Sequence, residues 1–191
     1  MKNTVLLSED SKNYLCCFYQ TLDQMIQAMT NACPTRSISR CFVAQMLPHH
    51  RAAIQMSSNI LRFTENQSVR RLAQRVIKDR TQSIDLLEGT LEPGGRLITP
   101  QQDLRLYQRR TELICRDMYV NMSRAPEHNR LAVVYLRHTL PLRIGAVRMV
   151  ETTLKYDVCT ELVPILRSIA VQQRREIAQT RALLSRLECQ R

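Results

Sequence analysis

Residues 42–56 read FVAQMLPHHRAAIQM, and their apolar side chains repeat with the period of an α-helix. From Phe42 to Met56 the apolar residues recur three and four positions apart, which places them on one helix face. The adjacent pair His49 and His50 lies within the same stretch. The stretch therefore predicts an amphipathic helix that turns thioether and imidazole groups toward the interior of a helical protein.

The side chains of Met46, His49, His50 and Met56 form the one dense cluster of metal-capable groups in the sequence. Thioethers favour Cu(I) and imidazole suits copper, zinc, iron or nickel, so the mixed set indicates copper more than carboxylate-bound metals. The same residues also suit an apolar core, because methionine fills irregular gaps and a buried histidine is usually hydrogen-bonded. Both interpretations stay open at this point.

The order of residues in this stretch also resembles a known family signature. The pattern F…M…HH..AI.M of the DUF305 family is matched by Phe42, Met46, His49, His50, Ala53, Ile54 and Met56. The resemblance implies a small ferritin-like helical bundle, and it implies copper binding through Met and His, which is described for some members. One departure is Ser39, which stands where the family often has an acidic residue.

The chain also matches itself when it is shifted by 93 residues without a gap. The matched pairs include Met25 with Met118, Met29 with Met122, Phe42 with Tyr135, Pro48 with Pro141, Ala53 with Ala146, Met56 with Met149 and Ile84 with Ile177. A fixed shift of this kind predicts a tandem duplication. Residues 1–95 would form unit one, which holds the Met/His motif, and residues 96–191 a degenerate and basic unit two.

Each unit shows three segments of helical periodicity and no convincing strand pattern. We expect helices at roughly 9–32, 38–64, 67–91, 100–125, 127–156 and 161–188. Glu92-Pro-Gly-Gly is typical of a helix end, and Thr99-Pro100-Gln101-Gln102 of a capping box that begins the next helix. The predicted fold class is all-α, with two tandem three-helix units in a ferritin-like helical bundle arrangement.

Comparison of the units shows which side chains the scaffold does not require. Unit two has no counterpart of the histidine pair, so the fold does not depend on it. The replaced residues are Met46, His49 and His50, which correspond to Thr139, Leu142 and Arg143.

In the third helix, unit two is the one that keeps the family pattern. Gln173 and Glu176 of unit two resemble the family pattern Q..EI, whereas unit one has Arg80 and Ser83 at these positions. This leaves open whether Arg80 opposes a metal ion or extends outward to solvent.

Two methionines of the first helix complete the candidate metal site. Met25 and Met29 are one turn apart, and neighbouring helices of a bundle bring such faces together. Their counterparts Met118 and Met122 persist in the unit without histidines, which favours a packing role for this pair.

The cysteines and the N-terminus bear on the compartment. The seven cysteines are an odd number, show no C-x-x-C spacing and do not repeat between the units. This predicts reduced thiols rather than a disulfide framework or a zinc site. Residues 1–17 contain no unbroken apolar run, and no segment has the length of a membrane span. We therefore expect a cytoplasmic protein with no membrane partner.

The net charge of +11 suggests a second class of function. Residues 1–95 contain 11 basic and 8 acidic residues, whereas residues 96–191 contain 17 and 9, so unit two is the more basic half. A phosphate-binding face for nucleic acid could include Arg109, Arg110, Arg167, Arg174, Arg175, Arg181 and Arg186. The sequence has no interleaved aromatic platform and no helix-turn-helix, so solvated helix surfaces are the competing explanation.

Enzymatic motifs are missing from the sequence. No glutamate stands three residues before any histidine, as a di-iron bundle needs, and no Gly-rich phosphate loop, H-E-x-x-H or nucleophile motif is present. The leading hypothesis is a non-catalytic protein that binds a soft metal, Cu(I), through unit one. The alternatives are a structural or interaction protein, or nucleic-acid binding, and the oligomeric state stays open. The candidate ligands are Met25, Met29, Met46, His49, His50 and Met56.

Overall fold

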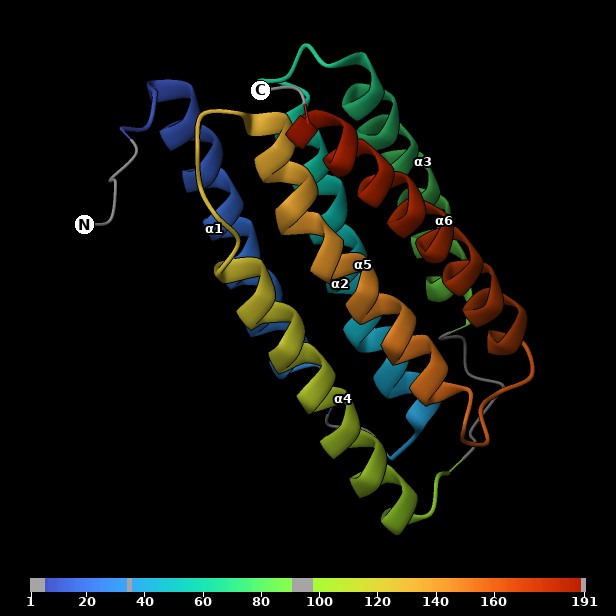
Figure 1. Cartoon of the computed structure of the whole chain (residues 1–191). Helices are drawn as coiled ribbons and strands as arrows, with labels where there is room; N and C mark the ends of the chain where they lie inside the picture. Colours follow the sequence, from blue (N-terminus) through green and yellow to red (C-terminus); the bar gives the residue numbers. More distant parts are fainter. Residues whose placement is uncertain (1–5, 34–35, 91–97, 190–191) are drawn as a thin grey trace.

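The computed structural model describes residues 6–33, 36–90 and 98–189, which form six helices and, within these ranges, no strand. The helices are α1 (Glu9–Thr30), α2 (Ile38–Ile60), α3 (Gln67–Gly89), α4 (Gln101–Ser123), α5 (Leu131–Thr153) and α6 (Leu162–Cys189), shown in Figure 1. The all-α prediction is confirmed, and the predicted helices match the observed ones in number and order.

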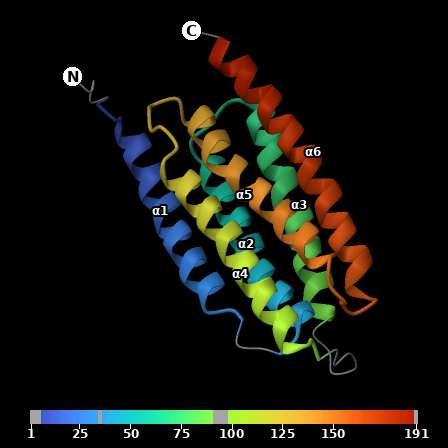
Figure 2. The same ribbon diagram turned by 60° about the horizontal axis from the view of Figure 1, so that its bottom comes forward.

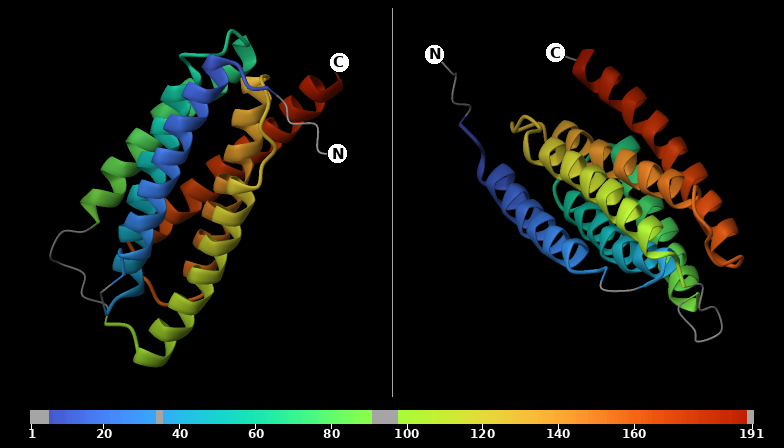
Figure 3. Two further views of the ribbon diagram at one scale, coloured as in Figure 1. Left: turned by 90° about the vertical axis from the view of Figure 1, so that its left-hand side faces the viewer. Right: turned by 90° about the horizontal axis from the view of Figure 1, so that it is seen from below.

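The helices pack in three layers of two. The buried helices α2 and α5 lie in the middle, with α1 and α4 on one side and α3 and α6 on the other (Figure 2). Figure 3 shows α1 and α6 at opposite edges of the bundle. Each layer therefore pairs the corresponding helices of the two predicted units.

One apolar core connects all six helices. Its fully or almost fully buried members include Tyr14, Phe42, Leu72, Ile114, Tyr135 and Leu166, one from each helix. A shared core of this kind means that neither set of three helices buries its apolar faces alone. The tandem duplication, the boundary between residues 95 and 96, and the ferritin-like relationship stay predictions. The expected stop at residues 92–95 lies outside the described residues.

Local signals explain where the helices begin. Ser8 accepts a hydrogen bond from the Ser11 amide at 3.2 Å, and Asn66 Oδ1 accepts from the amides of Ser68 and Val69, both at 3.1 Å. The predicted capping box differs, because Thr99 does not cap its own helix. Its Oγ1 accepts from the Ile38 amide at 3.1 Å, so Thr99 ties the start of α2 to the segment before α4.

A disulfide joins Cys33, after α1, to Cys41 in α2. The expectation of reduced thiols is therefore wrong for this pair. The other five cysteines, Cys16, Cys17, Cys115, Cys159 and Cys189, are free. The cytoplasmic location stays a prediction. None of the six described helices is long and apolar enough to cross a membrane.

Candidate functional site

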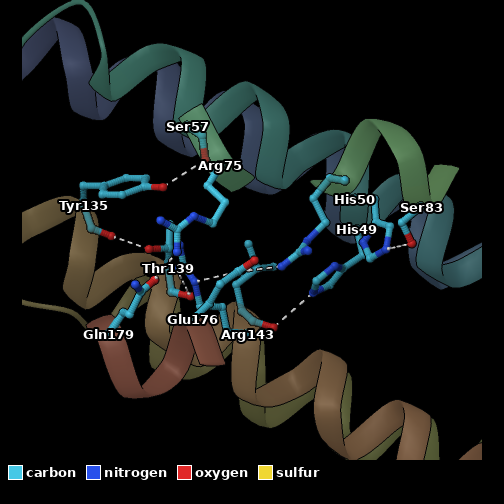
Figure 4. Close-up of polar contacts among 12 residues, drawn as sticks. His49, His50, Ser57, Arg75, Ser83, Tyr135, Thr139, Arg143, Glu176 and Gln179 are labelled. Carbon is cyan, nitrogen blue, oxygen red and sulfur yellow. Dashed lines mark hydrogen bonds and ion pairs between the residues drawn. The ribbon is translucent and has the colours of Figure 1, made fainter. Parts of the chain in front are cut away.

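A cluster of polar side chains lies buried inside the apolar core, between the central and the α3/α6 layers (Figure 4). Each of the four helices around it contributes a pair. The residues of this polar centre are His49 and His50 from α2, Arg80 and Ser83 from α3, Thr139 and Arg143 from α5, and Gln173 and Glu176 from α6. Burial of this many polar groups is costly unless they are paired, so their contacts determine what the centre can do.

Glu176 holds the centre together by pairing with two arginines. Its Oε2 accepts from Arg80 Nη2 at 2.6 Å and from Arg143 Nε at 3.2 Å. The three side chains are only 2–4 % exposed. Burial lowers the pKa of Arg80, although the neighbouring Glu176 carboxylate opposes this shift. Arg80 therefore does not extend to solvent. It forms a buried ion pair with Glu176, a residue of the other predicted unit.

Both histidines already use one ring nitrogen. His49 Nε2 donates to the Leu142 carbonyl at 3.0 Å, and His50 Nε2 lies 3.0 Å from Ser83 Oγ. Each Nδ1 is buried without a hydrogen-bond partner among the described residues. Desolvation, together with the nearby charge of Arg80, lowers the pKa of His49 to about 4 and that of His50 well below its usual value. Both imidazoles are therefore neutral at pH 7.

Residues 93 positions apart occupy matching places in this centre. His50 and Ser83 contact each other in α2 and α3, and their counterparts Arg143 and Glu176 contact each other in α5 and α6. His49 bonds directly to Leu142, its own counterpart. The contact therefore lies where the two central helices meet.

The structure places the two histidines of the predicted metal site next to each other. The histidine rings lie side by side, with centroids 5.7 Å apart. The methionines are packed in the core, and none lines the cavity of about 10 Å³ beside His49. In the described part of the chain, no group of three or more His, Cys, Asp or Glu side chains could hold a metal ion. All four methionines of the predicted site are buried, namely Met25, Met29, Met46 and Met56.

The charges of the centre also disfavour a cation. Two guanidinium groups share one carboxylate, so the centre carries an excess of positive charge. A metal ion bound by His49 and His50 would meet repulsion from Arg80 in a poorly solvated site. Comparison of the two predicted units had shown that Arg80 and Glu176 are each matched by a different residue type in the other unit. It did not find their pairing, because the two residues lie 96 positions apart.

A groove of about 600 Å³ opens above the polar centre, between α3 and α6. Glu176 lines both the groove and the small cavity beside His49. Three cationic side chains line the groove, and the Arg75 guanidinium donates to Gln179 Oε1 at 3.3 Å. The lining residues are Gln74, Arg75, Lys78, Asp79, Gln172, Arg175, Glu176 and Gln179.

The arginines proposed for nucleic-acid binding do not form one face. Those of α4 and those of α6 belong to opposite outer layers of the bundle. Arg174 pairs with Glu151 at 2.6 Å, and Arg110 donates to the Tyr156 hydroxyl at 3.1 Å. Arg175, the residue after Arg174 in α6, instead lines the α3–α6 groove.

The fold and the polar centre define a six-helix bundle protein with a charged interior. The model of the family described as a domain of unknown function (DUF305) matches residues 19–91 and again residues 40–184. The chain therefore belongs to the DUF305 family, as the histidine motif had suggested. A search of curated proteins and of solved structures finds no match. At Ser39, where the family often has an acid, the hydroxyl accepts from the Cys159 amide at 3.0 Å.

The buried histidines predict a pH-dependent stability. The folded-state pKa of His49, about 4, lies below its unfolded value near 6.5, so the unfolded chain binds more protons in acid. The contribution of neutral His49 to the free energy of unfolding is fully present above about pH 6.5. It is lost as the pH falls toward 4, and the loss is about 3 kcal/mol. Guanidinium unfolding between pH 7 and pH 4 measures this loss. His49→Leu, which introduces the residue found at position 142, should flatten the dependence, and an unchanged slope would contradict the assignment.

Proposed function

We propose that this protein is a non-catalytic binding protein that recognises a phosphate-bearing ligand in the α3–α6 groove. The observation that carries the proposal is the set of three cations, Arg75, Lys78 and Arg175, around one opening. Arginine offers a planar fork of donors that matches phosphate oxygens, and lysine adds a mobile point charge. The groove volume of about 600 Å³ suits a ligand larger than inorganic phosphate, within the usual range of small-molecule sites.

The buried ion pairs strengthen the positive field of the groove. Glu176 is the carboxylate at its floor, and Arg80 and Arg143 already neutralise that charge from below. Asp79 is the other carboxylate of the lining. Five cations thus face two carboxylates over the groove and its floor. An anionic ligand gains from this excess, and screening by salt should weaken its binding.

Adjacent arginines of α6 allow a matched test. Arg175 lines the groove, whereas Arg174 is paired with Glu151 outside it. With pyrophosphate as the probe in isothermal titration, Arg175→Gln should weaken binding about tenfold, the typical value of one charge-assisted hydrogen bond. Arg174→Gln should change the affinity by about threefold or less, because it removes only a screened charge. Equal losses in both variants would indicate nonspecific attraction to a basic surface.

Nucleic acid is the polymeric form of the same ligand chemistry, and the same variants separate it from a small ligand. A duplex or single strand would contact phosphates over a longer surface than the groove, so both arginines would contribute and the affinity would fall steeply with salt. Tight pyrophosphate binding with no electrophoretic shift of nucleic acid near physiological salt supports the groove. The reverse result supports the nucleic-acid alternative.

Soft-metal binding is the second candidate, and one observation favours it. The adjacent imidazoles of His49 and His50 each keep an Nδ1 that has no partner in the described part of the chain. The repulsion from Arg80 and Arg143 places this candidate below the phosphate-binding proposal. Competition between the reduced protein and a Cu(I) chelator tests it. If the histidines are ligands, His49→Leu combined with His50→Gln removes the bound copper, whereas unchanged copper uptake would assign any binding to the cysteines.

A further inference from the structure

The outer face of α4 carries a row of exposed apolar side chains. Leu106, Leu113 and Val120 are 42 %, 55 % and 37 % exposed, and each lies seven positions after the one before it. Residues seven apart lie two helical turns apart on one face, so the three side chains form a single row along α4. A helix at the edge of a soluble bundle usually turns polar side chains to water on this face. The apolar row is therefore a surface that a second protein could cover.

The matching positions of α1 show that the bundle does not require this row. A shift of 93 residues relates α4 to α1, which lies in the same outer layer. All three apolar residues correspond to exposed side-chain amides there, namely Asn13, Gln20 and Gln27. The apolar row is thus a feature of α4 that the shared helical architecture does not explain.

A row of alternating charges runs beside the apolar row. Its members also lie seven positions apart, and three of them stand three positions before an apolar residue of the row. In chain order they are Asp103, Arg110, Asp117 and Arg124, of which the last three are exposed. The matching residues of α1 do not alternate in charge, and they are Asp10, Cys17, Gln24 and Asn31. Both rows are therefore found on α4 and not on its counterpart.

We infer that the outer face of α4 is a self-association surface, on which α4 of a second copy lies antiparallel about a two-fold axis at Leu113. Each Leu113 then meets its own counterpart, and Leu106 of each copy lies opposite Val120 of the other. The charged rows also run in opposite directions, so every charge meets one of opposite sign. The facing pairs are Asp103 with Arg124 and Arg110 with Asp117.

The order of the two rows selects the antiparallel arrangement. In a parallel pair, the two-fold axis would run along the helices and would place the apolar row of one copy against the charged row of the other. Charged groups would then lose water without gaining a partner, which is costly. In the antiparallel pair the apolar rows face each other and the charged rows face each other.

The charged side chains keep the capacity for these contacts. Asp117 accepts from Arg148 through Oδ2 at 2.9 Å, and Arg110 donates to the Tyr156 hydroxyl through Nη1 at 3.1 Å. A carboxylate accepts at two oxygens and a guanidinium group has five N–H donors, so each can add a second partner. The contacts within one copy therefore do not block pairing between copies.

The contact is small, so the dimer should be weak. Three apolar side chains from each copy place the interface at the low end of the size range of specific complexes. Arg109 and Arg116 lie beyond the apolar row, on the side away from the charged row, and their exposed side chains can extend to solvent. Because α3 and α6 form the opposite outer layer, pairing through α4 leaves the α3–α6 groove open.

Sedimentation equilibrium of the full chain tests the pairing. The wild type should show a monomer–dimer equilibrium with a Kd of about 1–100 µM that reverses on dilution, which separates it from a disulfide-linked dimer. Leu113→Gln introduces the residue type found at Gln20 and should weaken the dimer about a hundredfold, because both copies lose their central anchor. Leu86→Gln is the matched control, since Leu86 of α3 is also 55 % exposed but lies in the opposite layer. This control should leave the Kd unchanged.

Charge reversal tests the antiparallel geometry. Asp117→Arg places arginines opposite Arg110, and Arg110→Asp places aspartates opposite Asp117, so each single variant should weaken the dimer about tenfold. The variant that carries both substitutions returns opposite charges to both facing positions and should recover the wild-type Kd. Circular dichroism should show unchanged helical content in all variants, because the substituted side chains are exposed.

Three results would overturn the inference. A wild-type chain that stays monomeric up to about 1 mM would exclude self-association and would assign the apolar row to a different protein. Equal weakening by Leu113→Gln and Leu86→Gln would place the contact elsewhere. A double charge reversal that stays as weak as the single variants would exclude the antiparallel geometry. The wild-type measurement needs no variant, so it decides the question even if a substituted chain does not fold.

Discussion

Replacing Glu176 by alanine should lower the free energy of unfolding by about 3–5 kcal/mol, the usual cost of breaking a buried ion pair from one side. The substitution leaves Arg80 and Arg143 buried with no carboxylate, and each is less than 5 % exposed. Two uncompensated guanidinium groups would then repel each other in a poorly solvated interior. Chemical unfolding at pH 7 measures the loss.

The exposed pair of Arg174 and Glu151 provides the control. Both side chains are about half exposed, at 57 % and 48 %, so water and salt screen their attraction. Glu151→Ala should cost no more than about 1 kcal/mol. A loss of similar size in the two variants would show that Glu176 is not the centre of the buried network.

A second large effect is expected when His50 is replaced by arginine, the residue type found 93 positions further along the chain at Arg143. His50→Arg would add a buried guanidinium beside Arg80, with the Ser83 hydroxyl as its partner. We expect a loss of about 3–5 kcal/mol, because the new charge is buried and unpaired. The sequence alone had suggested that this change is tolerated, since Arg143 occupies the matching position. The structure shows that Arg143 is tolerated because Glu176 pairs with it.

The compensating change follows from the same correspondence. Ser83→Glu in the His50→Arg background would reproduce the Arg143–Glu176 pair within unit one. The double variant should be more stable than His50→Arg alone, with a coupling energy of about 2–3 kcal/mol in a double-mutant cycle. If the effects of the two substitutions simply add, the new arginine and glutamate do not form a stabilising pair, which would contradict the expected match with Arg143 and Glu176.

The fold could be predicted from the sequence because each helix has one apolar stripe, and six stripes of helical period can be buried only by packing together. The burial of Met46 and of both histidines also follows from their place on that stripe. The polar contacts could not be predicted. Arg80 meets Glu176 across two helices, and periodicity carries no information on which charged residues of separate helices come together.

Two further differences between the sequence predictions and the structure have the same physical origin. Thr99 has the sequence environment of an N-cap, yet its hydroxyl accepts a bond from Ile38, a residue brought close by the packing of α2 and α4. Cys33 and Cys41 are eight positions apart, and this spacing alone does not show that their sulfur atoms come into bonding contact. Local signals thus predicted where the helices lie, whereas tertiary packing determined which side chains pair.

The measurement that tests the proposed function most directly is an NMR titration of the arginine Nε–Hε signals with pyrophosphate. Our account predicts saturable shifts for Arg75 and Arg175, which line the α3–α6 groove, with Arg174 and Arg110 unchanged at the same ligand concentration. Saturation should require a higher ligand concentration as salt is added. Uniform small shifts over all the arginines, or no shift at Arg75 and Arg175, would contradict a phosphate-binding groove.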